Sequence, residues 1–248
     1  MPDLYRRYGQ VFLRNASVAR AEARALSLPA GSNVVEIGPG TGILTAFLLD
    51  IGYYVKAVET DHRFIDVLRE RFSAELGEGR LSIVKGNILD FPGVLNTDGI
   101  AGNIPYSISS PLFELLCKSS FRFAVLMFQR EFGEKLLKLP GQRGFSRISA
   151  LSYLNVNARR IRNVPRTFFT PAPKVDSIIL RFERKEMMYP DKYEDILRTA
   201  FAGKRKKLKN VLPGLPPELG DMRIEELGEV QFLKLLDTIR NTLKEKKP

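Results

Sequence analysis

Residues 34–42 read VVEIGPGTG, and this stretch decides the fold of the 248-residue chain. Its β-branched start predicts a short buried strand, and Gly38, Gly40 and Gly42 predict a tight turn that leads into a helix. Because glycine has no Cβ atom, such a turn lets a small ligand approach the backbone. The dinucleotide fingerprint has the spacing G-x-G-x-x-G, whereas Ile43 fills the sixth place here, so a dinucleotide is disfavoured.

Strand and helix patterns alternate on both sides of this stretch, from about residue 16 to residue 183. This alternation is typical of an α/β domain whose parallel sheet is covered by helices on both faces. After Arg184 only helical patterns follow, separated by turns rich in proline and glycine. We therefore expect an α/β domain over residues 1–184 and a small all-helical domain over residues 185–248.

The net charge of +11 and the pI of about 9.8 favour a polyanionic partner. The alternative is a basic surface that only keeps the protein in solution, but the cations are clustered. Arg159, Arg160, Arg162 and Arg166 form one group. The densest group takes five of six positions: Lys204, Arg205, Lys206, Lys207 and Lys209. We expect this last group to bind an RNA backbone and to take no part in the chemistry.

Other features of the composition narrow the class of protein. No apolar run approaches the roughly 18 residues that cross a bilayer, and the N-terminus lacks the apolar segment of a signal peptide. A single cysteine and a single histidine argue against a disulfide and against a metal site built on either residue type. We therefore expect a cytoplasmic protein with no membrane partner and no structural metal, acting as a monomer.

Two strand ends after the glycine turn predict the rest of a cofactor site. Glu59 ends the strand after VVEIG, and a carboxylate there can accept hydrogen bonds from two ribose hydroxyls. Asn87 and Ile88 follow the next strand, where the amide can accept a hydrogen bond from an adenine amino group and Ile88 can lie against the ring. A turn asparagine is the alternative interpretation of Asn87.

The sequence NIPY at residues 103–106 predicts a site for a planar amine. The side-chain oxygen of Asn103 and the main-chain oxygen of Ile104 can accept the two N–H bonds of an adenine N6 amine and localise its lone pair. Tyr106 can stack on the base, and Phe169, ahead of a proline-rich extended segment, can cover the other face. A base held in this way is flipped out of a stack or unpaired. A structural Asn-x-Pro turn is the alternative.

With these motifs in order, the chain resembles the rRNA adenine N6,N6-dimethyltransferases of the KsgA type over nearly its whole length. The resemblance implies a Rossmann-like class I methyltransferase sheet and S-adenosylmethionine as the methyl donor. It also implies dimethylation of two adjacent adenosines in the 3′-terminal stem-loop of small-subunit rRNA, within a pre-ribosomal small subunit. By match to the family, the residues that contact the cofactor are Gln10, Val11, Leu13, Gly38, Gly40, Glu59, Asn87, Ile88 and Asn103.

The chain also departs from the family pattern. Val11 stands where the family usually has Asn or His, and Asn87 stands where it usually has Asp. The short C-terminal domain suggests an archaeal-type member. The alternatives are a macrolide-resistance type methylase of large-subunit rRNA and a non-catalytic ribosome-assembly factor with the same fold. The motif of a DNA adenine methyltransferase usually has proline where Ile104 stands.

Overall fold

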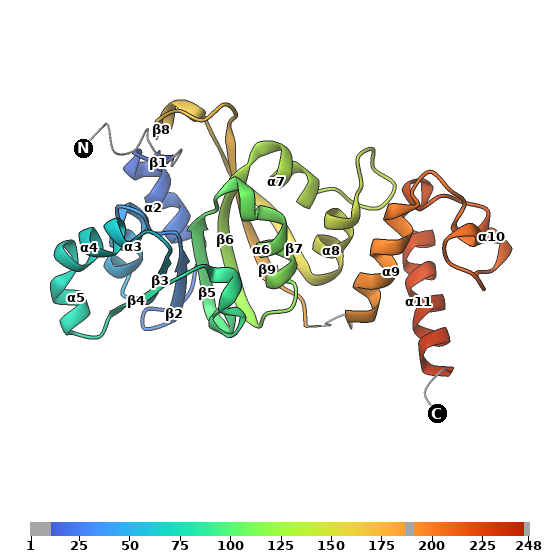
Figure 1. Cartoon of the computed structure of the whole chain (residues 1–248), viewed down its shortest axis with the longest axis horizontal. Coiled ribbons are helices and arrows are strands. Elements are labelled where there is room, and N and C mark those ends of the chain that lie inside the picture. Colours follow the sequence, from blue (N-terminus) through green and yellow to red (C-terminus); the bar gives the residue numbers. More distant parts are fainter. Residues whose placement is uncertain (1–10, 187–190, 246–248) are drawn as a thin grey trace. The chain divides into compact units, whose positions relative to one another are not determined.

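The computed structural model describes residues 11–186 and 191–245, and Gln10, one of the predicted cofactor contacts, lies outside these ranges. The chain divides into two compact units (Figure 1). Unit 1 comprises Met1–Gly133 and Asn157–Arg184, and unit 2 comprises Glu134–Val156 and Lys185–Pro248. One boundary falls after residue 184, and a further segment, residues 134–156, belongs to unit 2, so the chain leaves unit 1 at Gly133, returns at Asn157 and leaves again after Arg184.

A seven-stranded sheet forms the centre of unit 1. From one edge to the other its strands are β4 (Leu81–Lys85), β3 (Tyr54–Glu59), β2 (Asn33–Ile37), β5 (Thr97–Asn103), β6 (Phe121–Gln129), β9 (Ser177–Arg184) and β7 (Val156–Val164). The strands from β4 to β6 pair in parallel, as the alternation predicted. Strand β9 runs antiparallel to β6, so the sheet is mixed.

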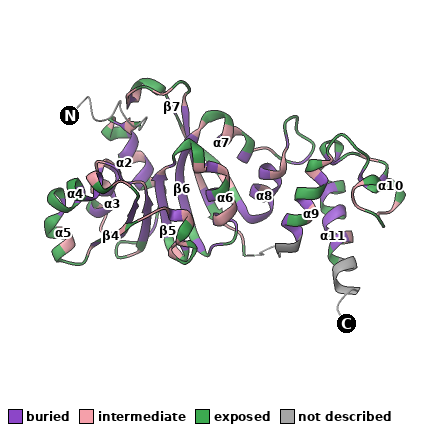
Figure 2. Cartoon of the chain, in the orientation of Figure 1, coloured by how far each residue is buried: buried purple, intermediate pink, exposed green. Residues whose placement is uncertain are grey.

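Strand β2 is central in this sheet because it pairs with a strand on each side. Ile37 at the end of β2 lies opposite Val58 of β3 and Gly102 of β5. The carboxyl ends of these strands therefore meet at one edge of the sheet, where open α/β sheets bind their ligands. Figure 2 shows buried residues concentrated on these strands, as expected for a sheet covered on both faces.

Helices precede, connect or follow the parallel strands of unit 1. They are α2 (Ala16–Ala25), α3 (Ile43–Asp50), α4 (His62–Arg71), α5 (Ser73–Gly77), α6 (Ser109–Leu116) and the start of α7 (Arg130–Leu136). The side chain of Asn15 accepts hydrogen bonds from the backbone of Ser17 and Val18 and so caps α2, while Asp61 caps α4 through the backbone of Arg63. A second, two-stranded sheet joins β1 (Phe12–Leu13) to β8 (Phe169–Thr170).

Unit 2 is helical, with α8 (Arg147–Asn155), α9 (Asp191–Ala202), α10 (Pro217–Gly220) and α11 (Glu229–Glu245). The ring of Phe145 lies 5.9 Å from that of Phe201 and 5.4 Å from that of Phe232, and Tyr153 also contacts Phe232. Aromatic packing of this kind forms its core. Within the residues described, no helix has the length and apolar character needed to cross a membrane.

Candidate functional site

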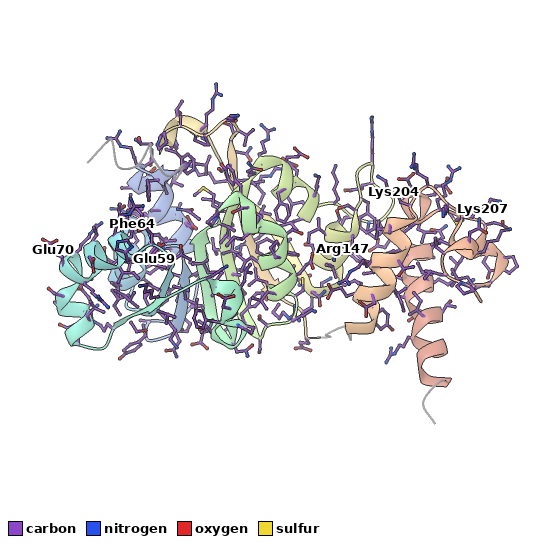
Figure 3. All side chains as sticks on the ribbon, in the orientation of Figure 1. Glu59, Phe64, Glu70, Arg147, Lys204 and Lys207 are labelled. Carbon is purple, nitrogen blue, oxygen red and sulfur yellow. The ribbon has the colours of Figure 1, made fainter. Side chains whose placement is uncertain are left out.

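A cavity of about 520 Å³ opens at the carboxyl ends of β2, β3 and β5 in unit 1. All the residues predicted to contact the cofactor or the base line it, except Gln10, which is not described. They are Val11, Leu13, Gly38, Gly40, Glu59, Asn87, Ile88, Asn103, Ile104, Tyr106 and Phe169. Segments that lie far apart in the sequence thus share one site, and Figure 3 labels Glu59 and Phe64 of this lining.

The carboxylate of Glu59 is buried and fixes the loop around the cavity. One oxygen accepts hydrogen bonds from the backbone N–H groups of Thr60 and Asp61, at 2.9 and 3.0 Å. The other oxygen accepts a bond from the N–H of Gly40 at 3.1 Å. A carboxylate oxygen has two lone pairs, so the oxygen that faces Gly40 can accept a further bond from a ligand hydroxyl.

The glycine loop brings bare backbone to the cavity. Gly38 has a φ of 65°, its N–H donates to the carbonyl of Val58, and a Cβ atom here would lie 3.9 Å from the main-chain oxygen of Asn103. Gly42 has a φ of 80°, and a Cβ atom there would lie 2.5 Å from the ring of Phe72. The loop therefore needs glycine both for its left-handed backbone and for close packing.

The side-chain oxygen of Asn103 has an acceptor capacity that nothing in the described structure satisfies. It is a buried atom without a hydrogen-bond partner. The position of the residue is fixed on both sides, because β5 pairs Asn103 with Met127 and the N–H of Ile104 donates to the carbonyl of Met127. A buried acceptor without a partner costs about 1–3 kcal/mol. The site is therefore built for a ligand that brings an N–H or O–H donor to this atom.

Two aromatic side chains, Tyr106 and Phe169, line the same cavity. Tyr106 is 37% exposed, and its hydroxyl lies 3.5 Å from the hydroxyl of Ser177, so its ring is open to a planar ligand. Phe169 is 8% exposed and pairs with Leu13 in the two-stranded sheet, so it is held more firmly than Tyr106. The structure thus brings both predicted stacking residues to the cavity.

Asn87 caps a turn and lines the cavity at the same time. Its side-chain oxygen accepts a hydrogen bond from the N–H of Leu89 at 3.1 Å, which starts a short 3-10 helix over Ile88–Asp90. The turn role that we gave as the alternative is therefore present. The second lone pair of that oxygen leaves room for the predicted bond to an adenine amino group.

Sequence reasoning gave no role to two buried carboxyl groups, one on β2 and one on α2. Glu36 is fully buried and accepts a hydrogen bond from the hydroxyl of Thr45 at 2.6 Å. Burial, together with the nearby charge of Glu59, raises the pKa of Glu36 to about 8. Glu22 on α2 is also buried, and burial together with Glu36 raises its pKa well above the ordinary value. The signal in the sequence that could have identified Glu22 as buried is its position on the apolar face of α2.

A family model for ribosomal RNA adenine dimethylase matches residues 3–237. The chain belongs to this family. It is 34% identical over 222 residues to a probable ribosomal RNA small subunit methyltransferase A of Methanospirillum hungatei, covering 88% of this chain and 86% of that one. It is also 34% identical over 217 residues to the ribosomal RNA small subunit methyltransferase A of Caulobacter vibrioides, covering 84% and 83%.

Solved structures agree with the family. A dimethyladenosine transferase from Plasmodium falciparum superposes with a TM-score of 0.80 at 30% identity, over 93% of this chain and 98% of that chain. The 23S rRNA methyltransferase ErmE has a TM-score of 0.71 at 25% identity, over 91% and 98%. The Rossmann-like class I methyltransferase fold is therefore confirmed. The chain is an rRNA adenine methyltransferase, and S-adenosylmethionine is its methyl donor.

The cavity fits this cofactor by its chemistry. The glycine loop, the fixed carboxylate of Glu59 and the buried acceptor of Asn103 supply close backbone approach, a partner for hydroxyls and a partner for a donor group. Within residues 11–186 and 191–245, no cluster of histidine, cysteine and acidic side chains could hold a metal ion.

The predicted RNA-binding cations lie in unit 2, after the end of α9 (Figure 3). They do not share one helix. Leu208 between them is fully buried, while Lys207 and Lys209 both bind the carboxylate of Asp221, at 3.0 and 2.7 Å. The charge of these two lysines is therefore partly compensated. The remaining members of the cluster, which are exposed or partly exposed and form no ion pair with the described residues, are Lys204, Arg205 and Lys206.

Proposed function

We propose that this protein dimethylates the N6 atoms of two adjacent adenosines in the 3′-terminal stem-loop of small-subunit rRNA. It does so as a cytoplasmic monomer acting on a pre-ribosomal small subunit. The proposal is supported by relatives whose names specify the small ribosomal subunit and dimethyladenosine transfer. The observation that carries the chemistry is the buried side-chain oxygen of Asn103, which has no hydrogen-bond partner among the described residues.

Asn103 and Ile104 prepare the amine. An adenine N6 amine that enters the cavity donates one N–H bond to the Asn103 side-chain oxygen and the other to the Ile104 main-chain oxygen. Accepting both bonds holds the nitrogen lone pair out of conjugation with the ring and fixes its direction. Because both acceptors are held by β5 and by the hydrogen bond from Ile104 to Met127, little reorganisation is needed.

The remaining residues hold the two reactants in place. The methyl donor supplies an electrophilic methyl group bound to a positively charged sulfur. Glu59 and the glycine loop hold the donor, while Tyr106 and Phe169 stack on the base. Base stacking of this kind contributes about 1–3 kcal/mol per base. The amine becomes acidic once it is methylated, so its proton leaves to water without a dedicated base.

The lysine-rich segment of unit 2, residues 204–209, provides affinity for the phosphate backbone of the rRNA in this proposal. Replacing Lys204, Arg205 and Lys206 with Gln removes three cations of the cluster. Each phosphate contact adds about 0.7–0.9 to the slope of log affinity against log salt, so the slope should flatten by roughly 2. Affinity for the methyl donor should be unchanged. An unchanged slope would show that the segment only makes the surface soluble.

A single experiment tests the target. The protein is incubated with radiolabelled methyl donor and, in separate reactions, with immature small subunits and with large subunits, and the labelled nucleotides are mapped. Label on two neighbouring adenosines near the 3′ end of small-subunit rRNA supports the proposal. Label on large-subunit RNA alone favours a second candidate function, methylation of an adenine in large-subunit rRNA. The TM-score of 0.71 with the 23S rRNA methyltransferase ErmE points to that candidate. Absence of label on both favours a non-catalytic assembly factor.

A further inference from the structure

Three arginines from neighbouring strands of unit 1 lie together outside the lining of the cavity. The guanidinium carbon of Arg181, on β9, lies 3.8 Å from the ring centroid of Phe123, and that of Arg122, on β6, lies 5.3 Å from it. Ile161 of β7 packs against the buried cluster that contains Phe123. Arg159 lies two residues before Ile161, on the same face of β7, and is near enough to Arg181 for its charge to act on that side chain, as the charge of Arg122 also does.

Within the described parts of the chain, the positive charge of this group is opposed only in part, by the nearby carboxylate of Glu183. None of Arg122, Arg159 and Arg181 forms an ion pair there, and the Nε atom of Arg181 is buried without a hydrogen-bond partner. Burial lowers the pKa of Arg181, and the charges of Arg159 and Arg122 lower it further against the opposing effect of Glu183. Like charges held close together repel one another and destabilise the folded protein, so a bound anion would relieve this repulsion.

The chemistry of the group matches a phosphate. Guanidinium groups present N–H donors in a planar fork that binds phosphate oxygens in pairs, and Arg181 is already oriented by stacking on Phe123. A buried Nε without a partner is a donor that an incoming oxygen can satisfy.

We propose that Arg122, Arg159 and Arg181 bind a phosphodiester group of the rRNA backbone. The proposal rests on the proposed function in assuming an rRNA substrate. It gives unit 1 an RNA contact of its own, independent of the lysine-rich segment of unit 2. Such a contact positions the RNA without reading its sequence.

Strand β7 offers a matched control. Arg160 and Arg162 alternate with Arg159 and Ile161, so the two pairs project from opposite faces of β7. The double variants Arg122→Gln/Arg159→Gln and Arg160→Gln/Arg162→Gln each remove two positive charges from unit 1. Arg122 and Arg159 are exposed, so their replacement opens no core, and thermal unfolding of both variants checks that they fold.

The test measures binding to immature small subunits over a range of salt concentrations. For Arg122→Gln/Arg159→Gln we expect affinity at low salt to fall roughly ten-fold or more, and the salt slope to flatten by about 0.7–0.9, the value for one neutralised phosphate. The Arg160→Gln/Arg162→Gln control should change the slope by less. Equal changes in both variants, or no change in either, would overturn the site.

Two further measurements distinguish an RNA contact from a free-phosphate site and test the methylation activity separately. Inorganic phosphate that stabilises the wild type but not Arg122→Gln/Arg159→Gln, with an unchanged RNA slope, would mean a site for free phosphate and would refute RNA binding here. Methylation of the same subunits is measured in parallel. A slope that depends on the arginines without any methylation would refute the proposed function and support the site, whereas methylation with an unchanged slope would do the reverse.

Discussion

Replacing Asn103 with Ala should separate activity from stability. The Asn103 side-chain oxygen is buried and makes no hydrogen bond with any residue that the structure describes. Its removal therefore breaks no bond there and relieves an unsatisfied acceptor, which costs about 1–3 kcal/mol. That gain is offset by the small cavity left behind, so the free energy of unfolding should change by less than about 1 kcal/mol. The methyl-transfer rate should nevertheless fall by about 10²–10³, the usual effect of losing one preorganised hydrogen-bond partner of the reacting group.

Asn87→Ala is the matched control, because Asn87 also lines the cavity but its side-chain oxygen already caps a turn. This variant should lose about 0.5–2 kcal/mol of stability, the usual value of a capping bond. At saturating methyl donor it should keep its single-turnover rate. Single-turnover methylation and urea unfolding of both variants provide the comparison. An Asn103→Ala enzyme within a few-fold of the wild-type rate, or one destabilised as much as Asn87→Ala, would refute the role given to the free oxygen.

Three other perturbations follow from the site. Glu59→Ala should weaken binding of the methyl donor, measured by calorimetry, by about 1–3 kcal/mol. It should also lower the unfolding temperature, because the Gly40 N–H loses its acceptor. Unchanged affinity would refute the role of Glu59 as a cofactor contact. Asp221→Asn frees Lys207 and Lys209, so the salt slope of RNA binding should steepen by about 0.7–0.9 for each lysine that reaches a phosphate; an unchanged slope would show that neither does. The pKa of Glu36 is raised from 4.5 to about 8, so the folded state binds more protons than the unfolded state, and stability should fall as pH rises between these values by up to about 5 kcal/mol. Glu36→Gln should flatten that fall in urea unfolding, and a wild-type stability that does not change over this range would contradict the raised pKa.

The parts of the site that could be predicted from the sequence are those formed by short, continuous motifs. The glycine loop follows one parallel strand, and Glu59 and Asn103 end two others. Because these strand ends meet at one edge of the sheet, their shared cavity could be expected. Strand β7 has no clear strand pattern in the sequence, because arginines separate its apolar, buried or partly buried positions, which are Val156, Ala158, Ile161 and Val164.

Pairings between distant residues could not be predicted. The carboxylate of Asp221 pairs with lysines that lie 12 and 14 residues away, and nothing local marks it as their partner. Glu22 comes near Glu36 because α2 packs against α3 and β6, whereas a glutamate on a helix ordinarily points to solvent. The missing hydrogen-bond partner of Asn103 is likewise a property of three-dimensional packing.

Residues 134–156 belong to unit 2 although residues on both sides of them belong to unit 1, and this affects how the chain can fold while the ribosome synthesises it. Strand β6 gains its antiparallel neighbour β9 only after residue 184 has emerged, because Phe123 pairs with Glu183. Phe145 is made early but packs against Phe201 and Phe232, which are made last. Unit 1 can therefore finish folding only after residue 184 has been made, and unit 2 only after Phe232 has been made. A chain ended at residue 184 should expose the aromatic face of the 134–156 segment and aggregate, while a fragment that starts at residue 185 should lack the aromatic partner that its core needs.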